Sequence, residues 1–234
     1  ARDLGASSVG LVAPYLSYMR QDRRFKPGEA ITSRTFARLL STHLDWLVTA
    51  DPHLHRYTKL GEVYPIPARV VRSTPLLSEW ISANVNRPFL LGPDMESKQW
   101  VSEVEGLIGA PYQVLRKTRY GDRTVEIAVP DASVVAGHTP VLVDDIVSSG
   151  RTMAVTADQM REQGLERPDL VAVHALFSEE TYRGLKEKAA AVVSANSVIH
   201  PSNAIDLSAV LANAVAEAMS GGFSVTSNKE ENHK

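Results

Sequence analysis

The stretch that decides the fold is VLVDDIVSSGRT, residues 141–152. It opens with a short, continuous apolar run of the kind found in strands buried on both faces of a parallel sheet. Two adjacent carboxylates, Asp144 and Asp145, end the run, and small residues then lead into a helical pattern. Acidic side chains at the end of a buried strand are costly without a partner. We therefore interpret the stretch as a ligand-binding strand, loop and helix rather than an ordinary connection.

The loop after the two carboxylates has the chemistry of a phosphate site. Backbone N–H groups and hydroxyls at a helix N-terminus bind phosphate well. The residues placed to supply them are Ser148, Ser149, Gly150 and Thr152. The carboxylates lie where ribose hydroxyls, or a metal ion bridging them, would bind. Neither a Walker A loop nor a GxGxxG fingerprint occurs in the chain.

Similar apolar runs recur on both sides of this stretch and alternate with helical patterns. Strands are predicted at residues 9–16, 46–51, 89–94, 141–146 and 170–176. Helices are predicted at residues 33–43, 76–85, 97–108, 152–163 and 179–188. This alternation predicts an α/β fold with mainly parallel sheets. Residues 112–118 and 124–129 flank a charged segment with a Gly-Asp turn signal, so they predict a β flap.

The composition is that of a globular protein with a real core, since 44% of the 234 residues are hydrophobic. We place a domain boundary near Asn86-Arg87-Pro88, which gives two α/β domains, residues 1–87 and 88–219. The polar tail, residues 220–234, is expected to be disordered.

Charge and cysteine content exclude several classes of function. The net charge of −2 gives no argument for a nucleic-acid partner. No apolar run approaches the roughly 20 residues that a membrane span needs. The chain has no cysteine, which removes disulfides, thiolate metal sites and cysteine nucleophiles. We expect a cytoplasmic enzyme that uses oxygen and nitrogen ligands.

Three more polar clusters follow predicted strands. Residues 15–24 (YLSYMRQDRR) carry three arginines and a glutamine, residues 49–55 are TADPHLH, and Asp94 ends a Gly-Pro-Asp turn. Guanidinium groups suit a phosphate chain, and an acid with two histidines can ligate a metal. Each cluster alone has other interpretations. The first could be a solvated basic loop, the second a hydrolase His-x-His motif for Zn²⁺ or Mn²⁺, and the third a plain turn.

Taken together, these segments resemble the ribose-phosphate pyrophosphokinase (PRPP synthetase) family. The residue 141–152 stretch resembles the PRPP-binding loop that the family shares with type I phosphoribosyltransferases. LRKTR at residues 115–119, followed by GDR, resembles the family's catalytic flexible loop in its archaeal-like form. The resemblance implies two phosphoribosyltransferase-type domains. The first of them is expected to lack its opening part, because nothing matches the acidic loop with which family members begin.

The resemblance also implies roles for individual residues. The residues expected to contact ATP are Arg20, Gln21, Asp22 and His53, and those expected to act in catalysis are Lys117 and Arg119. Ribose 5-phosphate is expected at Asp144, Asp145, Ser148, Ser149, Gly150, Arg151 and Thr152. Mg²⁺ is expected at His53 and Asp94. His55 receives no role.

The implied reaction is transfer of diphosphate from Mg-ATP to the 1-hydroxyl of ribose 5-phosphate, giving PRPP and AMP, in a homo-oligomer. One alternative is a type I phosphoribosyltransferase, which would leave Arg20, Gln21 and His53 unexplained. The other is a catalytically silent regulatory subunit. The unmatched N-terminal region favours the silent subunit, whereas the retained Lys117 and Arg119 oppose it.

Overall fold

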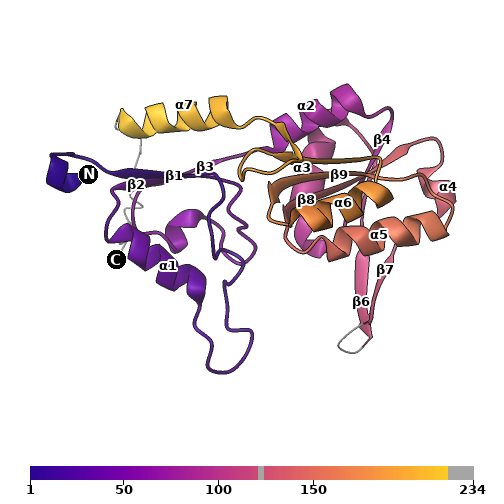
Figure 1. The fold of residues 1–234 in the computed structure, drawn as a ribbon, viewed down its shortest axis with the longest axis horizontal. Helices are drawn as coiled ribbons and strands as arrows, with labels where there is room; N and C mark the ends of the chain where they lie inside the picture. The colour runs from indigo at the N-terminus through magenta and orange to yellow at the C-terminus, as the bar shows by residue number, and fades with distance from the viewer. Residues whose placement is uncertain (121–123, 221–234) are drawn as a thin grey trace, which may run out of the picture. The chain divides into compact units, whose positions relative to one another are not determined.

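A computed structural model describes residues 1–120 and 124–220 (Figure 1). The chain forms two compact units, the first built from Ala1–Val71 and the C-terminal helix, and the second from Arg72–Leu207. These units differ from the predicted ranges 1–87 and 88–219. The segment 72–87 joins the second unit because its helix packs against the next helix along the chain. Of the predicted tail, all but Ser220 lies outside the described residues.

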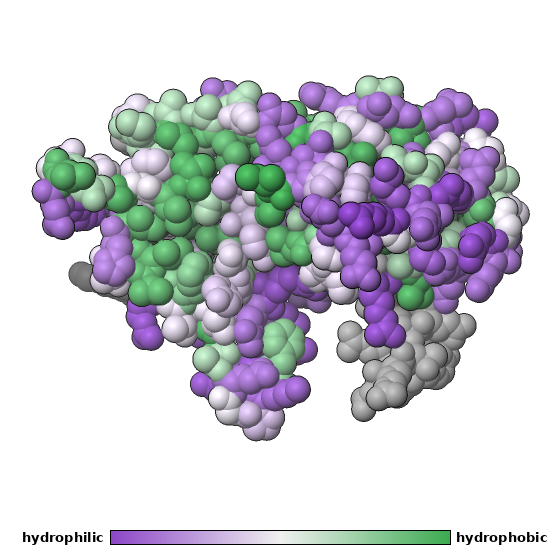
Figure 2. Space-filling model, in the orientation of Figure 1, coloured by the Kyte–Doolittle hydropathy of each residue, from purple (hydrophilic) through white to green (hydrophobic). Residues whose placement is uncertain are grey.

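The first unit is a three-stranded parallel sheet with helices packed on it. Its strands, in spatial order, are β1 (Gly10–Ala13), β2 (Trp46–Ala50) and β3 (Ala68–Val71). Its helices are α1 (Thr32–Ser41), α7 (Ser208–Met219) and the short 3-10 helices η1 (Arg2–Leu4) and η2 (Leu60–Glu62). A core that includes Leu47, Met19 and Tyr64 holds the strands to the loops that follow them. Figure 2 shows hydrophobic residues gathered on one face of this unit, over its strands and α7.

The second unit is a six-stranded parallel sheet with an attached hairpin. Its strands, in spatial order, are β11 (Asn203–Ile205), β10 (Ala191–Ala195), β9 (Asp169–Ala175), β8 (Thr139–Val147), β4 (Pro88–Gly92) and β5 (Tyr112–Val114). Its helices are α2 (Thr74–Asn84), η3 (Met95–Ser97), α3 (Lys98–Ile108), α4 (Ala132–Val135), α5 (Arg151–Glu162) and α6 (Glu179–Lys188). The hairpin pairs β6 (Arg116–Tyr120) with β7 (Thr124–Ala128). None of the described helices combines the length and the apolar character that a membrane span requires.

The strand order of the second unit places a topological switch point between β4 and β8. From β4 the chain passes through α3 to β5 on one side, and from β8 it passes through α5 and α6 to β9 and β10 on the other. Because such crossovers are right-handed, α3 covers the face opposite to α5 and α6 (Figure 1). In open α/β sheets, ligands bind beyond the carboxyl ends of the strands at a switch point. The stretch 141–152 lies at this position.

The α/β class and the parallel sheets are confirmed, and each of the five predicted strands and five predicted helices is present. The prediction for the first arm of the flap was wrong in part. Residues 112–114 pair with β4 as an edge strand of the sheet, and only residues 116–120 form the arm of the hairpin. Leu115 divides the two, because its side chain is fully buried and its N–H donates to the carbonyl of Gly92 at 2.8 Å.

Candidate active site

Three carboxylates gather at the switch point of the second unit. Asp94 follows β4, and Asp144 and Asp145 lie on β8, the strand next to it. The two adjacent aspartates do not end the strand as predicted, because β8 continues to Val147 by pairing with β9. The N–H of Asp145 donates to Asp144 Oδ1 at 3.0 Å, and the N–H of Ile146 donates to Asp145 Oδ1 at 2.8 Å. These bonds fix both carboxylates.

The carboxyl group of Asp144 lies in an environment that disfavours its charged form. Burial raises its pKa well above the usual range, and the negative charges of Asp145 and Asp94 raise the pKa further. A divalent cation would offset this repulsion. Mg²⁺ prefers oxygen ligands and usually keeps several waters, so that one or two carboxylates and the substrate phosphates are enough. The described residues contain no cluster of three or more His, Asp or Glu side chains that could hold a metal alone. The repulsion at Asp144 is the observation that fits a bound divalent cation.

The raised pKa of Asp144 predicts how pH affects stability. Where a folded-state pKa exceeds the unfolded value, the folded state binds more protons, and its stability falls as pH rises through that interval. We expect the free energy of unfolding to fall as pH rises from the ordinary aspartate pKa of 3.8 towards the raised value. In Asp144→Asn this part of the pH dependence should be lost. Urea unfolding of both proteins in metal-free buffer across this pH range tests this, and unchanged profiles would contradict the assignment.

The turn between β8 and α5 has the backbone geometry of an anion site. Ser148 and Ser149 are exposed, and Gly150 is buried with φ +67°, immediately before the first residue of α5. A Cβ atom at Gly150 would lie 2.5 Å from Thr181 Cγ2 and 3.2 Å from Leu185 Cδ1. Glycine is therefore required here for both the left-handed backbone and the close packing against α6. The N–H groups of the first turn of α5, with the positive end of the helix dipole, face the end of β8.

In the first unit, the segment after β1 is tied to the start of α1. The hydroxyl of Thr32 donates to Gln21 Oε1 at 2.8 Å, and the N–H of Ser33 donates to the carbonyl of Gln21 at 3.2 Å. With its oxygen engaged in this way, the side-chain amide of Gln21 presents its NH₂ group as a donor. Arg20, next to it, is exposed. This arrangement suits a ligand that brings oxygen acceptors, as a phosphate chain does.

The segment after β2 holds its backbone in a strained conformation. Asp51 and His53 have φ values of +34° and +50°, and Tyr18 in the segment after β1 has φ +66°. Non-glycine residues in this region cost about 1–2 kcal/mol each and cluster at functional sites. His53 is buried, whereas His55 is exposed, with the ring centroids 6.2 Å apart. Strained residues therefore occur in both segments of this unit that are predicted to contact ATP, the one after β1 and the one after β2.

The buried carboxylate of Asp22 has a partner that the sequence did not indicate. Nη1 of Arg56 donates to both oxygens of Asp22, at 2.8 and 2.9 Å. The two residues are 34 positions apart. They meet because parallel neighbours β1 and β2 end at the same edge of the sheet, so the segments that follow them lie side by side.

Comparison with known proteins agrees with the geometry of both units. Residues 59–230 match the family model of the phosphoribosyl transferase domain. Residues 1–43 match that of the N-terminal domain of ribose phosphate pyrophosphokinase.

Curated relatives decide the family. Ribose-phosphate pyrophosphokinase of Methanopyrus kandleri is 33% identical over 224 residues, which are 94% of this chain and 75% of that protein. The chain belongs to the ribose-phosphate pyrophosphokinase family. The Methanothermobacter thermautotrophicus pyrophosphokinase is also 33% identical, over 180 residues, 76% of this chain and 61% of that protein. The chain thus spans roughly three fifths to three quarters of these relatives' length.

A solved member of the pyrophosphokinase family has the same fold. Phosphoribosylpyrophosphate synthetase from Mycobacterium smegmatis superposes with a TM-score of 0.79 at 24% identity. The match covers 94% of this chain and 74% of that one.

The predicted pyrophosphokinase residues fall into two groups. The second unit brings together Asp94, the two aspartates of β8 and the 148–152 turn, whereas the first unit brings residues 20–22 beside residues 53–56. The predicted metal ligands His53 and Asp94 belong to different units. Lys117 and Arg119 lie in β6, and their side chains are outside the part of the chain that the structure describes. The roles of all these residues stay predictions.

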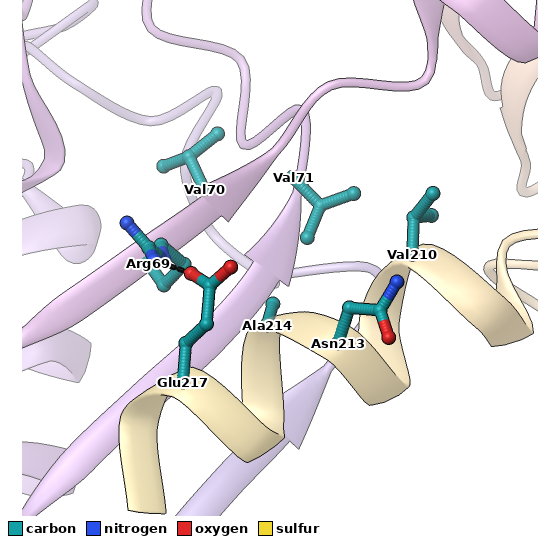
Figure 3. A pocket seen from close by; sticks show the side chains of 7 residues that line it. All are labelled: Arg69, Val70, Val71, Val210, Asn213, Ala214 and Glu217. Atoms are coloured by element: carbon teal, nitrogen blue, oxygen red, sulfur yellow. Dashed lines mark ion pairs between the residues drawn. The ribbon is translucent and has the colours of Figure 1, made fainter. Parts of the chain in front are cut away.

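A groove in the first unit lies apart from the predicted site residues. It has a volume of about 410 Å³ and runs between β3 and α7. Figure 3 shows Glu217 of α7 reaching to Arg69 of β3, with which it forms an ion pair, while Val71 and Asn213 line the wall farther along. Since none of the predicted ATP or ribose residues lines it, we do not assign the groove to the pyrophosphokinase reaction.

Proposed function

We propose that this chain transfers the diphosphate group of Mg-ATP to the 1-hydroxyl of ribose 5-phosphate, giving PRPP and AMP. The observation that carries this proposal is the pair of carboxylates on β8 joined to the Gly150 turn, at the switch point of a second unit that matches the phosphoribosyl transferase domain. Carboxylates bind ribose hydroxyls and a turn of N–H groups binds a phosphate, so one stretch recognises both ends of ribose 5-phosphate.

In the second unit, each part of this stretch has a role in orienting the sugar. Ser148 to Thr152 would hold the 5-phosphate through N–H groups and hydroxyls. Asp144 and Asp145 would accept hydrogen bonds from the ribose hydroxyls and so fix the direction of the 1-hydroxyl. This oxygen attacks the β-phosphorus and loses its proton to solvent. The bond between the β-phosphorus and the oxygen that bridges to the α-phosphorus breaks, and AMP leaves with that oxygen.

The first unit would hold ATP. Arg20 is exposed, the Gln21 amide is presented as a donor, and His53 lies on a strained backbone. These features support contacts with the phosphate chain. A phosphoribosyltransferase that only consumes PRPP would not need these residues, and the match to the pyrophosphokinase N-terminal domain also argues against that alternative.

Mg²⁺ is the proposed metal, and the residues proposed to bind it are Asp94 in the second unit and His53 in the first. The negative charge of Asp94 acts on the nearby carboxyl group of Asp144, which supports a cation at Asp94. Such an ion, when bound, would screen the repulsion between the two anionic substrates. Lys117 and Arg119 are proposed to stabilise the negative charge of the transferring diphosphate.

A homo-oligomer is proposed as well. Large apolar side chains of the first unit are exposed, among them Leu4, Val12 and Met219. Contiguous exposed apolar surface often marks a protein interface. The cytoplasmic location stays a prediction.

The proposed reaction is tested by incubating the protein with ribose 5-phosphate, Mg²⁺ and ATP labelled at the β-phosphorus. We expect the label to appear in PRPP with one AMP for each PRPP. A folded protein that forms no AMP would favour the silent subunit. Consumption of added PRPP only when a nucleobase is present would indicate a phosphoribosyltransferase instead. ATP labelled at the γ-phosphorus is a matched control, because transfer of diphosphate carries both labels into PRPP, whereas transfer of a single phosphate carries only the γ label.

A further inference from the structure

Arg56 has no role among the predicted contacts, yet it forms an ion pair with a buried carboxylate of the first unit. One guanidinium nitrogen contacts both oxygens of Asp22, at 2.8 and 2.9 Å. The Asp22 side chain is 1% exposed and that of Arg56 is 35% exposed. The carboxylate of Asp22 is therefore shielded from solvent, whereas the guanidinium group of Arg56 is partly exposed to it. Both oxygens of the carboxylate are occupied by a residue of the chain itself.

The neighbours of this pair extend it into a network that joins three segments. The hydroxyl of Tyr57 donates to the carbonyl of Asp22 at 3.4 Å and lies 3.2 Å from the hydroxyl of Ser33. Ser33, in the first turn of α1, donates its N–H to the carbonyl of Gln21. The network thus ties the segment after β1, the start of α1 and the segment after β2 together. Two of these segments carry the proposed ATP contacts.

We infer that Arg56 is a positioning residue for ATP, which acts by holding Asp22 and, through it, Arg20 and Gln21. This inference rests on the proposed function. A carboxylate beside a triphosphate would repel it, whereas the same carboxylate paired with a guanidinium group is neutralised and serves as an anchor. Asp22 therefore acts through Arg56 and not by contact with ATP. Without Arg56, a buried carboxylate would lose its partner, and the segment that carries it would have to move.

The variant Arg56→Gln tests this inference in the full chain. We expect the KM for ATP to rise by about 10- to 100-fold, because displacement of a positioned group by 1 Å can cost roughly 100-fold. The KM for ribose 5-phosphate should change by less than about twofold, since that substrate is held by the other unit. Arg56→Lys keeps a charge and should recover part of the loss. Initial rates with each substrate varied separately give these values.

A matched control lies at the opposite end of the same sheet. Nη2 of Arg2 contacts both oxygens of Asp45 at 2.8 Å, in the same one-nitrogen arrangement. Asp45 precedes β2, so this pair is at the amino edge, away from the proposed ATP segments. Arg2→Gln should leave both KM values unchanged. A rise in the KM for ATP in Arg2→Gln equal to that in Arg56→Gln would overturn the inference, because any broken ion pair would then have the same effect.

Non-additive effects of substitutions at Arg56 and Asp22 on the KM for ATP provide a second test of the inference. Asp22→Asn keeps the shape of the side chain and removes its charge. If the two residues act as a unit, the double variant should raise the KM for ATP no more than the more affected single variant. If the double variant instead raises the KM for ATP by the product of the two single effects, that result would overturn the inference. So would a lower kcat in Arg56→Gln with both KM values unchanged, since that describes a residue that only maintains the fold.

Direct binding separates this inference from the proposed reaction. Calorimetry with Mg-ATP alone, in the absence of ribose 5-phosphate, compares the wild-type chain with Arg56→Gln. Weaker binding in the variant supports the inference even if the wild-type chain forms no PRPP, in which case only the proposed reaction fails. Equal binding in the two proteins, or no binding of Mg-ATP to the wild-type chain, would overturn the inference.

Discussion

Lys117→Ala is expected to lower kcat for PRPP formation by about 1,000-fold, with little change in either KM. A preorganised cation that meets charge developing on a transferring phosphoryl group contributes roughly 10²- to 10⁵-fold. Because this contact strengthens in the transition state, its loss appears in kcat rather than in KM. Lys117 lies on β6 of a hairpin that extends from the sheet of the second unit (Figure 1). Initial rates of AMP and PRPP release at saturating substrates measure the effect.

Arg116, the neighbouring cation in β6, is the matched control. Arg116→Gln removes a positive charge from the adjacent position of the same strand without removing the proposed contact. We expect kcat to fall by less than about threefold, a change of under roughly 1 kcal/mol in the barrier. Comparable losses in the two variants would show that only the net charge of the hairpin matters. Lys117→Arg should retain more activity than Lys117→Ala, because it keeps the charge.

The elements that could be predicted from the sequence are those whose pattern is local. β8 and β9 are continuous apolar runs long enough to be buried on both faces, and their sequences indicate strands without knowledge of their neighbours. The Gly150 turn was also predicted, because an aspartate pair, small residues and a helix start fall within twelve positions. What this pattern could not show is that β8 continues past the carboxylates. Ile146 and Val147 are part of the strand because His174 and Ala175 of β9 pair with them.

The elements that could not be predicted depend on distant partners. Residues 191–195 (AVVSA) follow two alanines that come after the end of α6, and they form a strand because β9 offers an edge to pair with. Helix α7 joins the first unit although the whole second unit separates it in sequence from β2 and β3, on which it packs. Arg56 had no local signal either. Its pairing with Asp22 depends on β1 and β2 being parallel neighbours, which brings residue 56 to residue 22.

Gly150→Ala is expected to combine lower stability with weaker binding of ribose 5-phosphate. An L-residue at φ +67° costs about 1–2 kcal/mol, and a Cβ atom 2.5 Å from Thr181 Cγ2 forces the turn or α6 to move, at about 1–3 kcal/mol. The free energy of unfolding should fall by roughly 2–5 kcal/mol. The KM for ribose 5-phosphate should rise tenfold or more, because the N–H groups of the turn lose their alignment. Urea unfolding and initial rates measure the two effects.

Gly164→Ala separates the steric cost of the new Cβ atom from the cost of placing alanine on a left-handed backbone. Gly164 lies beyond the other end of α5 with φ +75°, and a Cβ atom there would meet nothing within 4 Å. This variant should lose only about 1–2 kcal/mol and keep its KM. In the Gly150→Ala background, Thr181→Ser removes the methyl group that the new Cβ would strike and keeps the hydroxyl, so it should recover part of both losses. If Thr181→Ser recovers nothing, the contact with the Thr181 methyl group is not what requires glycine at position 150.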